Sequence, residues 1–382
     1  MVSTRRAQKA RMLITRWLPN EVLTHIIGYL YRPDQATVAR ISRLFHGLTL
    51  PLLNRTIVLD MVDRPDIIWE LCLTFTDHPE RADAVRSLTI MNSSWGESNL
   101  DFSQLFETIN LMKQLEYLHF EDGRSHDALI SRLSVLSLPD LSTLHMIFPQ
   151  SDLRNTAVSE FLSRHPTLTH VHLWDIDDSE SDPTPPDREL LGTPNLLPNL
   201  QLYQGTTQFL DAFCTRSLEA ARICVHQGNI HKVLALEELR DPALPFALSL
   251  DIRVKDDEMR EVLEFLAEHA TYITSLQIRI LGRRFPDEIT ACIDSITQFL
   301  PQFPNLGNLE LNHDFYNSPL LAVSEEAWQT WIGIAPTLRA CCVGKRAWQK
   351  VDQLESQWVE YTRNKFEAQA GFSSFLLVYQ YC

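Results

Sequence analysis

Three histidines recur in this sequence at nearly equal intervals, at His119, His145 and His172. Imidazole groups at a regular spacing can sense pH, bind a metal ion or bind an acidic partner. The plainer interpretation is a row of solvated polar side chains, which is the usual state of polar residues on a protein surface. If the three rings lie side by side, about 5 Å apart, their mutual repulsion opposes protonating all of them together.

Large apolar side chains accompany these histidines. Ile147 and Trp174 each follow a histidine by two residues, and Tyr203 takes the equivalent position in the next repeat of the pattern described below. Residues two apart on a strand share a face, so we expect all three beside the histidine row. Exposed apolar patches often bind partners, and Trp and Tyr are frequent hot-spot residues. Partner contact and coverage by a loop or by the C-terminal tail both remain open.

Motifs that signal catalysis or a bound cofactor are missing from the sequence. It contains no HExxH, no Walker loop, no GxSxG and no Cys/His spacing typical of a metal site. The seven cysteines include no CxxC pair, which favours reduced thiols in a cytoplasmic or nuclear protein. We therefore expect no enzymatic activity, no cofactor and no metal site.

The elements that would position these side chains follow from a repeated apolar pattern, at positions a, a+3 and a+5. Successive repeats begin 21 to 33 residues apart, except for one interval of 55 residues, in which 246–252 is a further expected strand. The pattern occurs at Val85-Leu88-Ile90, Leu115-Leu118-Phe120, Leu141-Leu144-Met146, Leu168-Val171-Leu173, Leu197-Leu200-Leu202, Leu218-Ala221-Ile223, Ile273-Leu276-Ile278 and Leu306-Leu309-Leu311.

Helices are expected between these strands. Segments 161–173 and 299–311 show the repeat most directly, because they share Phe, Leu, Pro, Leu and a final Leu at equivalent positions. This alternation predicts an α/β fold, a curved leucine-rich-repeat-like solenoid with parallel strands on the concave face and helices on the convex face. A doubly wound nucleotide-binding fold is disfavoured, since no Gly-rich phosphate loop follows any strand. The expected helices are 102–112, 126–136, 156–164, 208–214, 256–269, 287–300 and 325–334.

In such a solenoid, side chains at a, a+3 and a+5 point into the core, and those at a+4 and a+6 project from the concave face. The a+4 row is then Thr89, His119, His145, His172, Gln201, Arg222, Gln277 and Glu310, and the a+6 row is Met91, Glu121, Ile147, Trp174, Tyr203, Cys224, Arg279 and Asn312. Six of these residues are candidates for binding a client protein: His119, His145, His172, Ile147, Trp174 and Tyr203.

Residues 175–198, rich in Asp and Pro, are an expected solvated acidic loop, with calcium binding as a lesser alternative.

A different pattern marks the N-terminal region. Apolar residues recur at helical spacing from Leu18 to Leu30, and Pro19 lies where the first turn of a helix needs no amide donor. A second apolar face continues through Val38, Ile41 and Phe45. About forty residues of helix cannot bury all of these side chains alone, so a partner or the following domain should cover the rest.

The same residues resemble an F-box: Leu18-Pro19-Asn20-Glu21-Val22-Leu23, Ile26, Leu30, Pro33-Asp34, Val38, Ile41-Ser42-Arg43 and Phe45 follow its pattern without a gap. The run 51–57 looks especially similar to F-box proteins of fungal type. The resemblance implies docking onto a Skp-family adaptor within a cullin-RING ubiquitin ligase. Gln35-Ala36 departs from the family, which commonly has leucines there, and the departure implies weaker adaptor binding or an altered partner. The implied adaptor-binding residues are Leu18, Pro19, Val22, Leu23, Ile26, Ile27, Leu30, Pro33, Val38, Ile41 and Phe45.

Composition is consistent with a folded chain that binds neither nucleic acid nor a membrane. Hydrophobic residues make up 45% and charged residues 22% of the sequence, and a net charge of -15 would repel phosphates. No apolar run approaches the roughly 18 residues needed to cross a bilayer. The basic, acid-free start is expected to be a disordered tail, with nuclear import or mitochondrial transit as alternatives.

The expected domains are therefore a tail at 1–16, an F-box-like helical domain at 17–57, the repeat solenoid at 58–338 and a C-terminal cap or tail at 339–382. This organisation favours a substrate-recognition subunit of a Skp-cullin-F-box ubiquitin ligase, in which the repeats bind a protein client. The alternative is a leucine-rich-repeat scaffold with no connection to a ligase.

Overall fold

The computed structural model describes residues 18–60, 67–92, 102–122, 132–148, 156–175, 196–205, 207–213, 215–225, 227–252, 256–280, 286–313, 320–350 and 358–372. The basic tail at 1–16 and nearly all of the acidic loop at 175–198 lie outside these residues. Backbone contacts divide the chain into two units, one formed by residues 1–120 with 135–141 and the other by residues 121–134 with 142–382. Each unit is described by itself.

Unit 1 begins with three short helices, α2 (Asn20–Gly28), α3 (Arg32–Ala39) and α4 (Arg43–Asn54). Pro33 lies in the first turn of α3, where its missing amide hydrogen costs no helical hydrogen bond. Ser42 caps α4, because its side-chain oxygen accepts the Phe45 amide hydrogen at 3.3 Å.

Gln35 connects α3 to the end of α2. Its side-chain amide donates to the Ile27 carbonyl at 3.3 Å and to the Leu30 carbonyl at 3.0 Å, and the side chain is buried. The Ile27 carbonyl in the last turn of α2 also accepts the Leu30 amide hydrogen, so Gln35 adds a second donor there and supplies a donor to the Leu30 carbonyl just after the helix. A leucine at this position would have no group to offer them.

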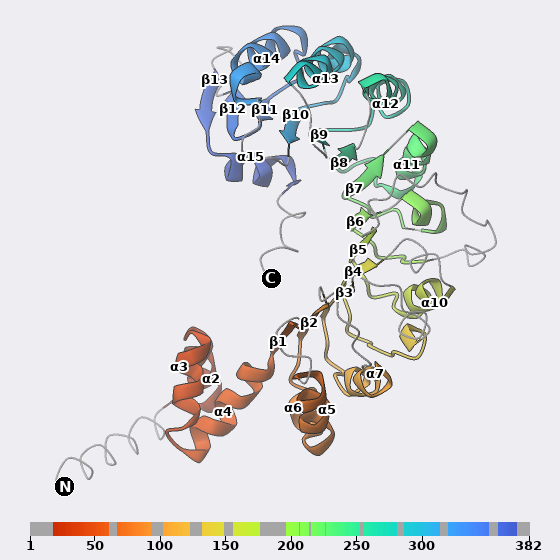
Figure 1. Cartoon of the computed structure of the whole chain (residues 1–382). Helices are drawn as coiled ribbons and strands as arrows, with labels where there is room; N and C mark the ends of the chain where they lie inside the picture. Colours follow the sequence, from red (N-terminus) through yellow and green to blue (C-terminus); the bar gives the residue numbers. More distant parts are fainter. Residues whose placement is uncertain are drawn as a thin grey trace, which may run out of the picture. The chain divides into compact units, whose positions relative to one another are not determined.

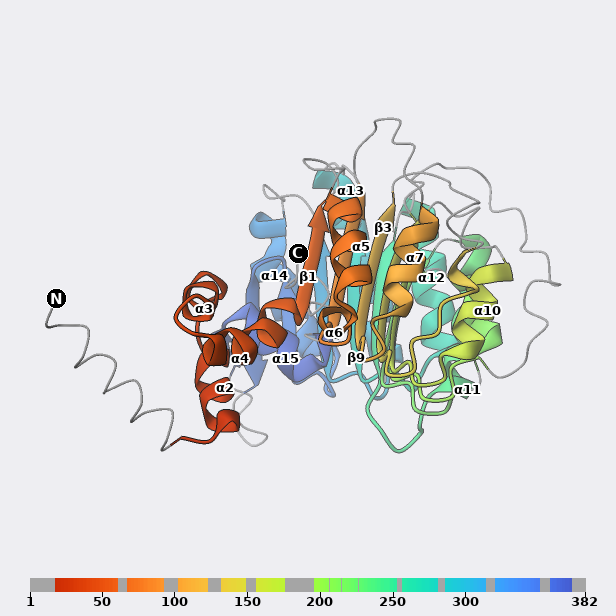
Figure 2. The same cartoon turned by 90° about the horizontal axis from the view of Figure 1, so that it is seen from below.

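The remainder of unit 1 alternates strands with helices. The strands β1 (Thr56–Asp60) and β2 (Ser87–Asn92) are parallel, with Ile57 opposite Leu88. The amide hydrogens of Glu116 and Tyr117 both bond the Arg86 carbonyl, which sets the start of β3 (Tyr117–Asp122) beside β2. Helices α5 (Ile67–Asp77) and α7 (Phe102–Asn110) run along one face of these strands, and α6 (Pro79–Ala82) follows α5 (Figure 2). The first parallel strand thus begins at Thr56, slightly before the boundary expected at 57.

Unit 2 continues the alternation of strand and helix, and its strands β4 to β11 are all parallel and hydrogen-bonded in chain order. The coarse expectation of an α/β repeat array is therefore confirmed. The elements are β4 (Thr143–Phe148), α10 (Thr156–Arg164), β5 (His170–Asp175), β6 (Leu202–Gly205), η2 (Thr207–Ala212), β7 (Ala220–Val225), η3 (Gln227–Leu234), α11 (Ala235–Leu239), β8 (Ala247–Ile252), α12 (Asp256–His269), β9 (Ser275–Ile280), α13 (Pro286–Phe299), η4 (Leu300–Gln302), β10 (Asn308–His313), α14 (Leu320–Ile334) and β11 (Ala340–Val343).

Most expected elements of unit 2 lie where the pattern put them. The helices expected at 156–164 and 256–269 are α10 and α12. The strand expected at 246–252 is β8, so the 55-residue interval between repeats contains one further strand. The helix expected at 208–214 is instead the 3-10 helix η2. The helix expected at 126–136 lies largely outside the described residues.

The expected register of β6 was wrong. In the structure Tyr203 pairs with Val171 and Gly205 pairs with Leu173, so the repeat reads Leu200-Tyr203-Gly205 and not Leu197-Leu200-Leu202. Tyr203 therefore points into the core, where it is fully buried and meets the Phe213 ring edge-on with a centroid separation of 5.0 Å. Gly205 hides the repeat from an apolar search, because it stands where the other repeats have a large apolar side chain.

Helices α12, α13 and α14 cover the outer face of the unit 2 sheet, and the last helix, α15 (Arg363–Ala370), lies on the opposite, inner face (Figure 1). Before it come β12 (Arg346–Lys350) and β13 (Trp358–Tyr361), which are antiparallel to their neighbours. The parallel array thus extends past residue 338 into the expected cap, as far as β11.

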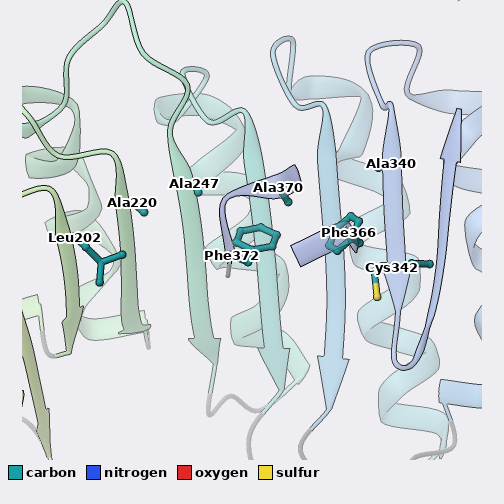
Figure 3. Packing of buried hydrophobic residues seen from close by; sticks show 9 residues of the cluster. Leu202, Ala220, Ala247, Ala340, Cys342, Phe366, Ala370 and Phe372 are labelled. Atoms are coloured by element: carbon teal, nitrogen blue, oxygen red, sulfur yellow. The ribbon is translucent and has the colours of Figure 1, made fainter. Parts of the chain in front are cut away.

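An apolar cluster holds α15 against the sheet. Phe366, Ala370 and Phe372 pack on small or apolar side chains of the inner face (Figure 3). Phe366 is completely buried. The partners on the strands are Leu202, Ala220, Ala247, Ala340, Cys342 and Ala347. Among the residues that the structure describes, none forms a helix with the length and apolar character needed to span a membrane.

Candidate functional site

The N-terminal helices of unit 1 carry an exposed apolar stripe. On α2, Leu23 and Ile27 are buried, whereas Val22 is 40% exposed and Ile26 49% exposed. Leu30 and Ile41 extend the stripe, with 37% and 39% of their surfaces exposed. A helix this short with one face buried and another apolar face exposed is typical of a surface that binds a partner.

The implied adaptor-binding residues divide by exposure. Two of them, Leu23 and Ile27, hold the three helices together and are not accessible. The exposed members are Pro19, Val22, Ile26, Leu30, Pro33 and Ile41, and Leu18, Val38 and Phe45 are half-buried. Gln35 is buried and bonded to α2, so its departure from the family does not remove an exposed apolar side chain.

The a+4 positions of unit 2 form a continuous row of polar side chains along the inner face. The strand register aligns His145, His172, Gln204, Arg222, Ser249, Gln277 and Glu310. Gln204 replaces the expected Gln201, as the corrected register of β6 requires. All seven side chains are buried, so the expectation of solvated polar residues was wrong.

The histidines illustrate why these side chains are buried. His145 and His172 stack face to face, with ring centroids 3.9 Å apart and an interplanar angle of 7°. The Trp174 ring meets His172 edge-on at 5.5 Å. Each ring thus covers its neighbour, and the pairing of His145 with His172 confirms the part of the spacing prediction that concerns these two histidines.

His119 belongs to unit 1 and is also buried. Burial lowers its pKa from 6.5 to about 4, because the charged imidazolium loses its hydration. At neutral pH this ring is therefore uncharged. It lies in unit 1, whereas His145 and His172 lie in unit 2.

Ile147 and Trp174 face each other across β4 and β5 and are partly exposed, as expected for the a+6 row. The Arg222 guanidinium lies 5.1 Å from the centre of the Trp174 ring. A cation over an indole is attracted by the negative face of the ring. Of the expected apolar patch, Ile147 and Trp174 are thus on the inner face, whereas Tyr203 is not.

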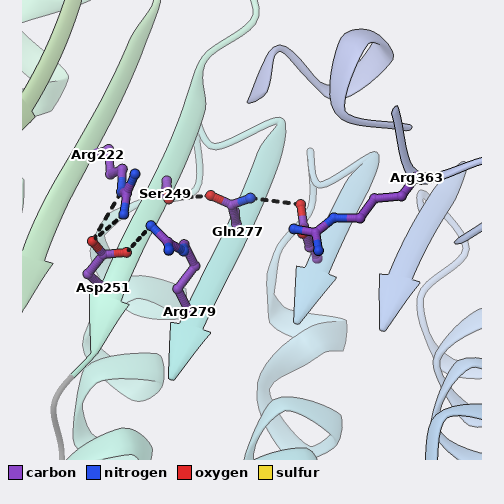
Figure 4. A network of polar contacts seen from close by, with 7 residues as sticks. Arg222, Ser249, Asp251, Gln277, Arg279 and Arg363 are labelled. Carbon is purple, nitrogen blue, oxygen red and sulfur yellow. Dashed lines mark hydrogen bonds and ion pairs between the residues drawn. The ribbon is translucent and has the colours of Figure 1, made fainter. Parts of the chain in front are cut away.

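Two buried networks fix the polar side chains of β7 to β10 (Figure 4). In the first, Arg222 donates twice to one oxygen of Asp251, at 3.0 and 2.9 Å, and Arg279 lies 3.4 Å from the other oxygen. Asp251 is fully buried, and two arginines on neighbouring strands supply the positive charge that a buried carboxylate requires.

The second network ties α15 to the sheet. Ser249 bonds Gln277, and the Gln277 amide donates to one oxygen of Glu310 at 2.8 Å. Arg363 of α15 donates to the other oxygen of Glu310 at 2.7 Å. Burial raises the pKa of Glu310 to about 7, although Arg363 and Gln277 act in the opposite direction. This contact fixes the first residue of α15 over β10.

Pattern reasoning missed several of these residues. Asp251 and Ser249 fall in the repeat whose register was ambiguous, and aligning β8 with its neighbours would have found them. Arg363 could not be found from the repeat pattern, because it lies on α15, a helix that packs on the inner face of the strands and does not follow the repeat. Among the described residues, no group of three or more His, Cys, Asp or Glu side chains is arranged to hold a metal ion.

Comparisons with known proteins give a distant structural neighbour. No protein-family model matches the sequence, and no curated protein matches it. A protein from Bacteroides fragilis of known crystal structure is similar at 13% sequence identity, over 79% of this chain and 74% of that chain, with a TM-score of 0.40.

Proposed function

We propose that this chain is a substrate-recognition subunit of a Skp-cullin-F-box ubiquitin ligase. In this role α2, α3 and α4 dock on a Skp-family adaptor, and the inner face of unit 2 holds a protein client. The chain itself supplies position and not chemistry, because bringing a client close to the transferring enzyme is enough to accelerate the transfer.

The observation that carries the proposal is the exposed apolar stripe of α2. Val22 and Ile26, which are 40% and 49% exposed, are four residues apart on α2, and Leu30, 37% exposed, lies two residues past the end of the helix. Residues at this spacing lie on one face of a helix and fit a groove on a partner. The same residues stand at the positions where the chain resembles an F-box.

The client half of the proposal rests on the partly exposed side chains of the inner face. Ile147 and Trp174 supply a partly exposed apolar surface, and the buried polar row behind them, which includes Arg222, is held by stacking and ion pairs. A preorganised surface loses little side-chain entropy when a partner binds.

Co-purification with a Skp-family adaptor tests the docking half. The double variant Val22→Asp/Ile26→Asp should bind the adaptor at least about tenfold more weakly, since it places two charges in an apolar contact. Val135→Asp/Leu234→Asp is a matched control, because these residues are 53% and 43% exposed and lie elsewhere in the chain. The control should bind the adaptor like the wild type.

Two outcomes would contradict the proposal. Full adaptor binding by the folded Val22→Asp/Ile26→Asp variant would show that α2 is not the docking helix. Recovery of neither adaptor nor cullin with the wild-type chain would favour the alternative of a repeat scaffold without a ligase. Circular dichroism of each variant establishes that it is folded.

A further inference from the structure

A groove of about 830 Å³ runs along the inner face of unit 2, at the edge where its parallel strands begin. Its floor is the a+2 row of successive strands, and the end of α15, at Ala370 and Gly371, forms one side. We call it the rim groove. Its floor residues include Leu202 of β6, Ala220 of β7, Ala247 of β8, Ser275 of β9 and Asn308 of β10.

Two cations stand together at one end of the rim groove. The Lys350 amide hydrogen bonds the Arg339 carbonyl at 2.8 Å, which places the two residues opposite each other across antiparallel strands. Both residues line the rim groove. Like charges directly opposite each other on a sheet are destabilising. Within the described residues, neither side chain has a carboxylate partner to offset this repulsion.

The acidic residue Glu219, just before β7, also lines the rim groove, whereas Arg339 and Lys350 lie beside β11. The net charge is -15, so acidic side chains are abundant enough to have neutralised them. An anionic group on a ligand would bind between the two side chains and remove their repulsion. The charge at this end of the rim groove therefore complements a carboxylate.

The length of the rim groove distinguishes a peptide from a small anion. Its lining runs from His170 on β5 to Arg339 beside β11, which is six intervals between neighbouring strands. At about 4.8 Å an interval this is roughly 29 Å, the span of about eight residues of extended chain. The exposed amide side chains of Gln201 and Gln369 also line it and can bond a peptide backbone.

We propose that the rim groove binds an extended acidic segment of a partner protein, with a carboxylate of that segment held between Arg339 and Lys350. This inference rests on the proposed function in one respect, since it identifies the partner as the client. It assigns the client contact to the strand edge near α15, in addition to the surface at Ile147 and Trp174.

An array of octapeptides tests the inference with the full chain. The array places Glu, Ala or Lys at each position in turn. The wild-type chain should prefer peptides with Glu near one end over the matching Lys peptides by about tenfold, and the double variant Arg339→Glu/Lys350→Glu should lose or invert this preference. Arg216→Glu/Lys365→Glu is the matched control, because it reverses an exposed Arg and an exposed Lys that do not line the rim groove.

The outcomes separate this inference from the proposed function. Equal binding of Glu and Lys peptides, or equal effects of the two double variants, would overturn the inference. Displacement of the Glu peptides by succinate at equal concentration would also overturn it, by showing a site for small anions. Adaptor binding is measured on the same proteins. If the wild-type chain binds the Glu peptides but does not bind the adaptor, the proposed function is overturned and this inference is not.

Discussion

Gly205 is a residue at which the backbone leaves no room for a side chain. Its φ is +142°, and a Cβ atom there would lie 1.9 Å from the Leu173 carbonyl oxygen. We expect Gly205→Ala to destabilise unit 2 by about 3 kcal/mol or more, as measured by chemical unfolding. The control is Gly333→Ala in α14, where an added Cβ meets no atom within 4 Å. It should raise stability by up to about 1 kcal/mol, and equal effects of the two would contradict this account.

His119 should make unit 1 sensitive to acid. Its folded pKa is about 4, so between pH 6.5 and 4 the unfolded chain binds a proton that the folded chain does not. Its contribution to stability is thus complete above pH 6.5 and is lost as the pH falls. Between pH 7.5 and pH 5 the wild type should lose about 2 kcal/mol more than His119→Gln, measured by urea unfolding. His25→Gln, at an exposed position, is the control. Parallel pH profiles for the wild type and His119→Gln would exclude the effect.

At the scale of single residues, the sequence predicted which side chains lie in the same row, but it did not predict whether they are buried or exposed. The spacing of His145 and His172 was enough to place them side by side, because parallel strands in register repeat the chain period. Their burial was not predictable, since it arises from stacking between neighbouring rings and from side chains on other strands. Tyr203 shows the opposite case, in which a single glycine two residues away shifted the apparent pattern.

Among the elements, α2 depends on α3 for its C-terminal cap. Gln35→Leu removes the hydrogen bonds to the Ile27 carbonyl of α2 and to the Leu30 carbonyl just after the helix. We expect a loss of about 1–2 kcal/mol in thermal unfolding, because both side-chain hydrogen bonds are lost, although the Ile27 carbonyl still accepts the Leu30 amide hydrogen. Adaptor affinity below the unfolding transition should not change, since Gln35 is not on the exposed stripe. Arg40→Leu, exposed at the end of α3, is the control, and a similar loss there would contradict the capping role.

Helix α15 should detach when its apolar anchor is removed. Phe366 is completely buried against the inner face, and its truncation in Phe366→Ala should weaken the docking of α15 by about 3–5 kcal/mol. Limited proteolysis should then cut within residues 363–372 well before the rest of unit 2. Lys365→Ala alters the exposed side of the same helix and should leave cleavage slow. Equal cleavage of both variants would argue against anchoring by Phe366.

The elements themselves were predictable to different extents. Helices such as α10 and α12 were found with their bounds, because their apolar spacing and the strand pattern agree. The helix α15 was not, since its residues follow no repeat and its position depends on Arg363 reaching Glu310 on a strand far away in the sequence. The strand β1 was absorbed into the F-box-like segment, whose run at 51–57 overlaps its start.

At the scale of the whole molecule, the proposed roles belong to separate units. The adaptor stripe lies on α2 in unit 1, and the rim groove lies in unit 2. Substitutions in one should therefore leave the other's binding unchanged, which is why the two sets of variants can be tested on the same chain. Effects of changes at independent sites, with no shared partner, usually add.

The antiparallel strands β12 and β13 have one more consequence. They occupy the hydrogen-bonding edge of β11, which would otherwise present unpaired backbone groups. A chain truncated after Gly344 should therefore associate through this open edge and form oligomers that grow with concentration, as sedimentation velocity would show. A chain ending at Phe372 keeps both strands and should stay monomeric over the same range. A monomeric Gly344 truncation would mean that the edge of β11 needs no cover, whereas polymers would identify the hairpin as the element that limits growth of the sheet to one molecule.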